Sequence, residues 1–118
     1  MAESLAPRER IRKKKDFLVL YKKGYRYKSK YFNLIGLSNA LPYSRVGVVA
    51  SRKVGNAVAR NRAKRWMREL FRRNKELLES PVDFLIVASA AIKEATWPEL
   101  EEQYLRAVRK IFEKKQAR

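Results

Sequence analysis

The sequence lacks two residue types that carry much of enzyme chemistry, because its 118 residues include no cysteine and no histidine. Their absence excludes a thiol nucleophile, a zinc site with cysteine or histidine ligands, and acid–base catalysis by imidazole. Long apolar runs are missing as well: the longest is Phe84–Ala88, far below the roughly 20 residues of a membrane-spanning helix. Residues 1–17 are basic and contain no apolar segment typical of a signal peptide. We therefore expect a cytoplasmic protein.

Acidic side chains are few relative to basic ones. The chain has 12 Asp and Glu against 29 Lys and Arg, which gives a formal net charge of +17. Such an excess predicts a polyanionic partner. Nucleic acid is the first candidate, and an anionic membrane surface is disfavoured because no strongly apolar amphipathic helix is visible. The carboxylates are scattered, with no pair at a spacing suited to two-metal hydrolysis. We expect no catalytic residue and no tightly bound metal ion in this chain.

The hydrophobic pattern predicts a single α+β domain over residues 1–118. Residues 1–13 are basic and poor in apolar anchors, and we expect them to form a mobile arm. Turn chemistry at 39–44 predicts that the strands on either side pair as a hairpin. The result is an α-β-β-β-α-β-α sandwich with helices on a small mixed sheet. Its predicted helices are 14–24, 56–74 and one from 96, and its predicted strands are 25–31, 31–38, 45–51 and 82–88.

The segment from Ser51 to Arg73 is the most informative part of the chain. It contains nine Lys or Arg and one acid, Glu69. At 3.6 residues per turn, cations gather on one side of the predicted helix and apolar residues on the other. Like charges four residues apart repel on a helix, so the pattern favours a bound polyanion over a merely solvated face. The row consists of Arg60, Lys64, Arg68 and Arg72, with Asn61 and Arg65 beside it.

A second candidate surface lies on the strands predicted at 31–38 and 45–51. Strand alternation gives one apolar core face and one face of smaller, more polar residues. Bordered by the first helix and by aromatic residues interleaved with cations, the second face is predicted to form an open trough for a single strand of nucleic acid. Bases stacked on rings there contribute about 1–3 kcal/mol each, although each aromatic residue has an alternative place in the core. The second face carries Asn33, Ile35, Gly47, Val49 and Ser51.

The string KVGNAVARNRAKR, from Lys53 to Arg65, resembles the signature of the bacterial ribonuclease P protein subunit. The resemblance implies the ribosomal protein S5 domain 2-like fold. That fold has an unusual left-handed β-α-β crossover, where the general rule favours a right-handed one. Shorter matches to the family are Arg10-Ile-Arg12, Asp16-Phe17, Gly24, Arg45-Val-Gly47 and Arg68-Glu69.

The resemblance also implies a function. Proteins of this family bind a large catalytic RNA, and the complex hydrolyses the 5′ leader from precursor tRNA with Mg²⁺ held mainly by the RNA. The chain is then an accessory subunit of an endoribonuclease. The implied contacts to the catalytic RNA are Arg52, Lys53, Asn56, Arg60, Asn61, Arg62, Lys64, Arg65 and Arg68. The implied contacts to the leader are Phe17, Tyr21, Asn33, Ile35, Val49 and Ser51.

Two other functions fit a basic α+β domain. A ribosomal or ribosome-associated structural protein binds RNA comparably but does not stimulate cleavage of precursor tRNA. A sequence-specific DNA-binding module prefers duplex DNA, and the sequence has no recognisable helix-turn-helix pattern. Cleavage of precursor tRNA therefore distinguishes the family function from its closest alternative.

Overall fold

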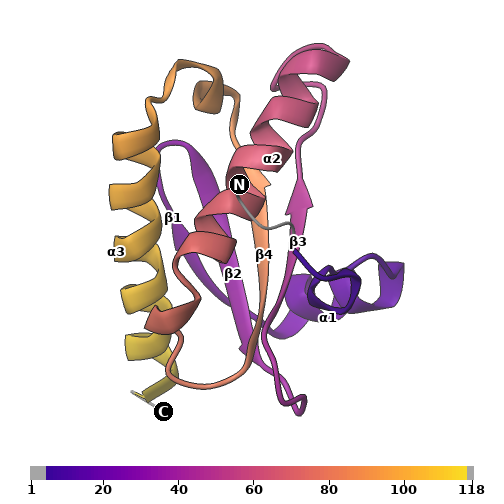
Figure 1. Cartoon of the computed structure of the whole chain (residues 1–118), viewed down its shortest axis with the longest axis vertical. Coiled ribbons are helices and arrows are strands. Elements are labelled where there is room, and N and C mark those ends of the chain that lie inside the picture. Colours follow the sequence, from indigo (N-terminus) through magenta and orange to yellow (C-terminus); the bar gives the residue numbers. More distant parts are fainter. Residues whose placement is uncertain (1–4, 117–118) are drawn as a thin grey trace.

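Four strands form one mixed sheet in the computed structural model, which describes residues 5–116 (Figure 1). The order across the sheet is β1-β2-β4-β3; the β1–β2 and β2–β4 pairs are antiparallel, and the β4–β3 pair is parallel. β4 is central, as expected of a continuous apolar run that needs cover on both faces. The strands are β1 (Tyr25–Lys28), β2 (Phe32–Ser38), β3 (Arg45–Val49) and β4 (Val82–Ala88).

The helices lie on both faces of this sheet. α2 and α3 share one face, where they enclose the main core around Leu34, Phe84 and Ile86. α1 lies apart from them, and its Leu20 packs on the opposite face against Ile35 and Leu85 (Figure 1). The predicted α+β order is confirmed. The α-helices are α1 (Lys14–Lys23), α2 (Ala57–Arg73) and α3 (Trp97–Gln116), and the short 3₁₀ segments are η1 (Pro7–Glu9), η2 (Lys75–Leu77) and η3 (Ala90–Glu94).

The predicted hairpin between the second and third strands is wrong. β4 lies between β2 and β3, so that Ile86 is opposite Leu34 on one side and Val48 on the other. The reason is the apolar content of β4, whose side chains join both cores of the domain. A strand that is apolar on both faces is most stable in the middle of the sheet, and this preference outweighs the short connection between β2 and β3.

The connection from β3 through α2 to β4 is left-handed. In Figure 1 both strands run upward, α2 passes in front of the sheet, and β4 lies to the left of β3. A right-handed crossover with the helix in front moves to the right. The handedness implied by the family resemblance therefore holds, against the general rule.

The expected mobile arm at residues 1–13 is corrected over the part that the structure describes. Residues 1–4 lie outside the described residues. From Leu5 onward the segment packs on the domain: Leu5 and Ile11 are buried, and the Ile11 amide donates to the Val46 carbonyl at 2.9 Å. Two buried apolar side chains and one backbone hydrogen bond to β3 hold this segment against the domain, although its composition is that of a basic tail.

The ends of the helices lie close to the predicted bounds. α1 stops at Gly24, whose amide donates to the Leu20 carbonyl at 2.8 Å. α3 begins with a capping box in which the Thr96 amide donates to Glu99 at 3.0 Å and the Glu99 amide to the Thr96 hydroxyl at 3.4 Å. Within residues 5–116, no helix is both long and apolar enough to cross a membrane.

Candidate nucleic-acid interface

The basic helix α2 begins where it was predicted to begin. Asn56 is its N-cap, and the Asn56 side-chain oxygen accepts from the Ala59 amide at 2.9 Å. Gly55 precedes it with φ +143°, a conformation that residues with a side chain rarely adopt. Ala63, Met67 and Leu70 are buried beneath the helix. This inner stripe fixes which side of α2 faces outward.

The predicted RNA-contacting residues lie on the outer side of α2 and on the loop before it. Arg60, Lys64 and Arg68 are half-buried along the flank of α2. The remaining six are exposed, and they are Arg52, Lys53, Asn56, Asn61, Arg62 and Arg65. The structure thus presents all nine at the surface, with guanidinium groups in the majority. Guanidinium groups suit phosphate oxygens, because each offers two parallel donors.

The row of cations ends earlier than the sequence suggested. The Arg72 Nε donates to Glu69 at 2.6 Å, and the Arg73 Nε donates to the same carboxylate at 2.9 Å. The hydrogen bond from Arg72 holds the pKa of Glu69 down at about 2. Glu69 therefore pairs with both cations of the C-terminal turn of α2 and offsets one of their two charges. The cations that remain for a partner lie mainly from Arg60 to Arg68.

Two arginines from the N-terminal segment extend the basic surface. Arg10 and Arg12 line a groove of about 280 Å³ together with Arg68. Burial, followed by repulsion from Arg10 and Arg12, lowers the pKa of Arg68. Within the described residues the buried Nε of Arg10 has no hydrogen-bond partner. The sequence singled out Arg10 and Arg12 only as family matches, and the fold is what brings them to α2.

The predicted trough lies on the face of the sheet that α1 partly covers. Strand register aligns Asn33 of β2, Val87 of β4 and Val49 of β3 in one row across the sheet. Asn33 is exposed and the two valines are half-buried, so this row forms the floor of the trough. Val87 was not among the predicted contacts, because the sequence did not indicate that β4 separates β2 from β3.

The aromatic wall of the trough comes from α1. A methyl group placed on Gly47 would come within 2.7 Å of the Phe17 ring, so glycine lets this ring approach the sheet. Phe17 is half-buried there, and Tyr21 is 39% exposed one turn further along. Tyr21 lies 5.9 Å below the guanidinium of Arg26 on β1. Both predicted aromatic residues therefore lie on α1 with part of their side chains accessible, and their place in a leader-binding trough stays a prediction.

Ile35 is a correction to the predicted trough. It is 1% exposed, because Leu20 of α1 covers it and Leu85 packs beside it. Ile35 supports the trough from beneath and is not on its surface. Other aromatic residues of the 17–32 segment also belong elsewhere: Tyr25, Tyr27, Tyr31 and Phe32 join the core on the face covered by α2 and α3.

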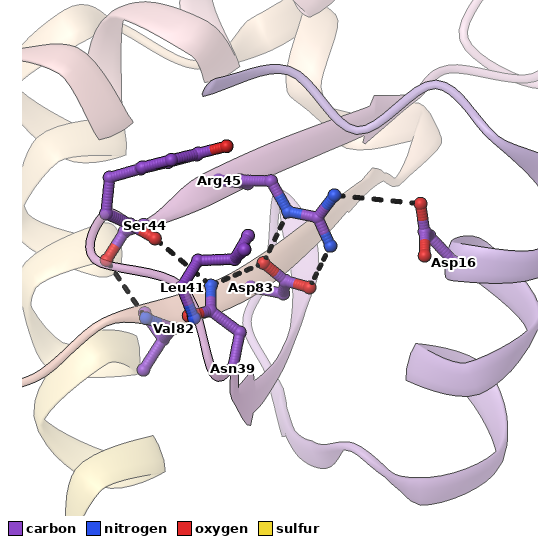
Figure 2. Close-up of polar contacts among 8 residues, drawn as sticks. Asp16, Asn39, Leu41, Ser44, Arg45, Val82 and Asp83 are labelled. Carbon is purple, nitrogen blue, oxygen red and sulfur yellow. Dashed lines mark hydrogen bonds and ion pairs between the residues drawn. The ribbon is translucent and has the colours of Figure 1, made fainter. Parts of the chain in front are cut away.

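An ion-pair network ties α1 to the sheet below the trough. The Arg45 guanidinium donates to Asp83 at 2.9 and 2.6 Å, and it lies 3.7 Å from Asp16 in the first turn of α1 (Figure 2). Asn39 donates to the same Asp83 carboxylate at 2.8 Å. The hydrogen bonds to Asp83 raise the pKa of Arg45. This network helps to fix where α1 stands relative to β3.

Ser51 joins the two surfaces. It is exposed two residues after β3 ends, beyond the trough floor. Its hydroxyl accepts from the Lys53 amide at 3.3 Å, and its carbonyl accepts from the Val54 amide at 3.0 Å. This turn carries the chain from the trough directly into the basic loop and then into α2. A strand of nucleic acid in the trough would therefore lie next to Arg52 and Lys53.

The chemistry of these surfaces is that of binding. Within residues 5–116, no three carboxylates lie close enough together to hold a metal ion. What the surfaces offer is cations for phosphates, amide and hydroxyl groups for base or sugar edges, and partly exposed rings for stacking. An α+β domain with a basic helix beside an aromatic-walled trough belongs to the class of RNA-binding proteins.

Comparison with known proteins identifies the family. The model of the family described as Ribonuclease P matches residues 5–112, and the chain belongs to this family. The ribonuclease P protein component of Thermotoga maritima is 42% identical over 94 residues, with 80% of each chain covered. That of Petrotoga mobilis is 34% identical over 113 residues, covering 92% of this chain and 96% of the relative. The chain is thus a ribonuclease P protein component of the tRNA-processing family, a membership that implies an RNA partner.

Solved structures agree with the fold. The Staphylococcus aureus RNase P protein superimposes with a TM-score of 0.77 at 30% identity, covering 86% of this chain and 93% of that one. The Thermotoga maritima RNase P protein gives a TM-score of 0.76 at 35% identity, covering 86% and 96%. The predicted fold class is confirmed, and the family match favours ribonuclease P over the ribosomal alternative.

Proposed function

We propose that the chain is the subunit of ribonuclease P that binds both the catalytic RNA and the 5′ leader of precursor tRNA, and so promotes endonucleolytic removal of the leader. The catalytic centre would lie in the RNA, which would hold the Mg²⁺ ions that supply Lewis-acid chemistry for the hydrolysis. This chain contributes binding and orientation, and no residue of it takes part in bond cleavage. We place this activity in the cytoplasm.

The basic helix supports contact with the catalytic RNA. Its exposed and half-exposed cations extend along α2 and the loop before it, from Arg52 to Arg68. Each phosphate that such a side chain neutralises releases counterions, so binding strengthens steeply as salt falls. Asn61 lies among these cations and offers both a donor and an acceptor to a base edge or a ribose hydroxyl. The same cations screen the repulsion between two RNA molecules that meet on this surface.

The trough supports contact with the leader. Its floor is nearly uncharged and its wall carries the rings of Phe17 and Tyr21, a combination that suits unpaired bases of any sequence. A precursor differs from a mature tRNA by its leader. An interaction that the leader alone makes therefore favours the precursor over the product, and this preference speeds product exchange.

The observation that carries the proposal is the continuity of the two surfaces at Ser51. The trough floor ends where the basic loop begins, and the Lys53 amide donates to the Ser51 hydroxyl. A leader in the trough and a catalytic RNA on α2 would therefore meet at this turn. Such a meeting places the bond between the leader and the tRNA body close to the catalytic RNA, which is an effect of proximity.

Reconstitution tests the proposal. Catalytic RNA of the family is assayed on a precursor tRNA at low Mg²⁺, alone and with the chain, and the affinities for precursor and mature tRNA are measured in parallel. We expect faster cleavage with the chain and tighter binding of the precursor than of the mature tRNA. If the chain binds the catalytic RNA but changes neither cleavage nor precursor affinity, the proposal fails and a purely structural RNA-binding role fits instead.

A further inference from the structure

A cavity of about 160 Å³ lies between α2 and η3, on the flank of α2 opposite the row that runs from Arg60 to Arg68. Residues two apart on a helix point about 200° apart, so Arg62 faces this cavity while Arg60 faces the other flank. Ala59 and Ala63 form its floor on α2, and Ile92 and Ala95 form its apolar side. We call this cavity the indole pocket, because the ring of Trp66 lines it.

The rim of the indole pocket is cationic. Arg62 and Lys93 both line it, and the Arg62 guanidinium stands 4.7 Å above the Trp66 ring. Within the described residues, neither cation takes part in an ion pair. This distinguishes Arg62 from Arg72 and Arg73, which the Glu69 carboxylate neutralises on the same helix. The rim therefore complements an anion, and the interior complements an apolar ring.

The side chain of Lys93 lies beside the N-terminus of α2, next to Gly55. A methyl group placed on Gly55 would lie 3.5 Å from the Lys93 Cδ and 3.9 Å from its Nζ. The ammonium group is thus held beside the exposed loop that carries Arg52 and Lys53. A phosphate at this rim would be continuous with the phosphates that the basic loop is proposed to bind.

We propose that the indole pocket binds one unstacked pyrimidine base of an RNA strand, with the adjoining phosphate on Lys93 and Arg62. Because the proposal rests on RNA as the partner of α2, it extends the proposed function to a second flank of the same helix. On binding, the base displaces the Arg62 guanidinium from the Trp66 ring, where it stands at 4.7 Å, and stacks on this ring, a kind of surface on which proteins hold splayed-out RNA bases. The site is separate from the trough, which lies on the opposite face of the sheet.

The size of the pocket sets the class of base. An apolar cavity of about 150 Å³ accommodates one benzene ring, and the indole pocket has a volume of about 160 Å³. A single-ring pyrimidine therefore fits within the pocket, whereas a two-ring purine would extend further toward its open side. Uracil or cytosine keeps its polar edge toward the open side, where the rim cations lie.

The chain carries its own reporter for this site. It has two tryptophans, Trp66 and Trp97, in T-shaped contact at 5.9 Å. Replacing Trp97 with Phe leaves Trp66 as the single indole, so its fluorescence reports on the pocket alone. Full-length Trp97→Phe protein is titrated with hexauridylate, with hexaadenylate, and with an abasic hexamer that carries the same phosphates.

We expect hexauridylate to quench Trp66 emission most, hexaadenylate less, and the abasic hexamer hardly at all. Adding Ala59→Leu fills the pocket without changing charge, and it should raise the hexauridylate concentration for half-maximal quenching by roughly tenfold, within the contribution of one stacked base. The matched control is Ala57→Leu, an exposed position outside the pocket. Lys93→Gln, on a different element, should weaken quenching severalfold, and circular dichroism verifies the fold of each variant.

Equal quenching by the abasic hexamer, stronger quenching by hexaadenylate, or an unchanged titration in both folded pocket variants would each overturn the pyrimidine site. The cleavage assay separates this failure from that of the proposed function. If the chain stimulates cleavage but quenching does not depend on the base, only the pyrimidine-site proposal is refuted. If quenching depends on the base but the chain does not stimulate cleavage, the pocket remains a binding site for single-stranded RNA and the proposed function is refuted.

Discussion

On α2 the outward side chains are guanidinium and ammonium groups, whereas the trough beside α1 is floored by the amide of Asn33 and the isopropyl groups of Val49 and Val87. Charged contacts act over about 10 Å at 0.1 M salt and weaken as salt rises, while stacking acts only on contact. From this difference we propose a division of labour, in which α2 would supply salt-dependent affinity for folded RNA and the trough would add a smaller preference for RNA with an unpaired end.

The largest expected effect comes from reversing charge on α2. The double change Arg60→Glu and Arg65→Glu removes two charge-assisted contacts and adds repulsion, so binding of the catalytic RNA should weaken by roughly 100-fold or more. The dependence of affinity on salt should also become shallower. Filter binding across a salt series measures both. The matched control is Arg106→Glu with Arg109→Glu, the same charge change on exposed positions of α3. If the control lost as much affinity for the catalytic RNA, the weaker binding would be due to net charge and not to contacts on α2.

A change in the trough should separate precursor from product. Phe17→Ala removes the ring that packs on Gly47 and borders the floor, so precursor affinity should fall roughly tenfold, the loss of about one stacked base. Affinity for mature tRNA should stay the same. Leu18→Ala changes a neighbouring residue of α1 that is 57% exposed, and it serves as the control. Equal losses for precursor and mature tRNA would show that Phe17 acts through folding and not through the leader.

A smaller effect should appear in the pH dependence of stability. Hydrogen bonds from Arg72 and then Arg73 hold the pKa of Glu69 at about 2, below its ordinary value of 4.5. The stabilisation is therefore complete above about pH 4.5 and is lost as the pH falls toward 2. Since Glu69 is 25% exposed, we expect a loss of less than about 1 kcal/mol. Urea unfolding at pH 6 and pH 3 measures it, and Glu69→Gln should reduce the difference between the two pH values.

The smallest effect is expected where the ion-pair network meets α1. Asp16→Asn removes a single contact of 3.7 Å to Arg45 and leaves the two hydrogen bonds between Arg45 and Asp83 intact. A partly exposed pair of this kind contributes under about 1 kcal/mol, so precursor affinity should fall by roughly twofold. Competition binding against unmodified protein resolves such a difference. A loss as large as that of Phe17→Ala would mean that Arg45 controls the position of the whole helix.

The two surfaces also differ in how far the sequence alone predicted them. α2 is one continuous segment, so helical periodicity placed Arg60, Lys64 and Arg68 on its flank before any fold was known. The signals that start a helix are equally local, and for that reason the start of this helix was correctly predicted at residue 56. What periodicity could not supply was the pairing of Arg72 with Glu69, because the choice between an internal and an external partner depends on side-chain geometry.

The trough depends on three segments that are distant in the chain, and local rules failed there. Turn residues at 39–44 predicted a hairpin, so no local pattern placed Val87 between Asn33 and Val49. Strand alternation correctly placed Ile35 on the face of the sheet that α1 covers. It could not show that Leu20 of α1 buries Ile35. Arg10 reached α2 only through the packing of Ile11 on β3. Long-range order in the sheet, and not residue type, was the missing information.

β4 is the last strand in the chain, and it lies between β2 and β3, so the sheet cannot be completed until β4 has been synthesised. β2 and β3 each leave one edge open until residues 82–88 occupy the space between them. During synthesis the cationic segment of α2 therefore leaves the ribosome before the sheet beneath it can close. A nascent chain at this stage carries the cations of α2 without the strand on which the trough depends, so we expect premature binding to polyanions to compete with folding.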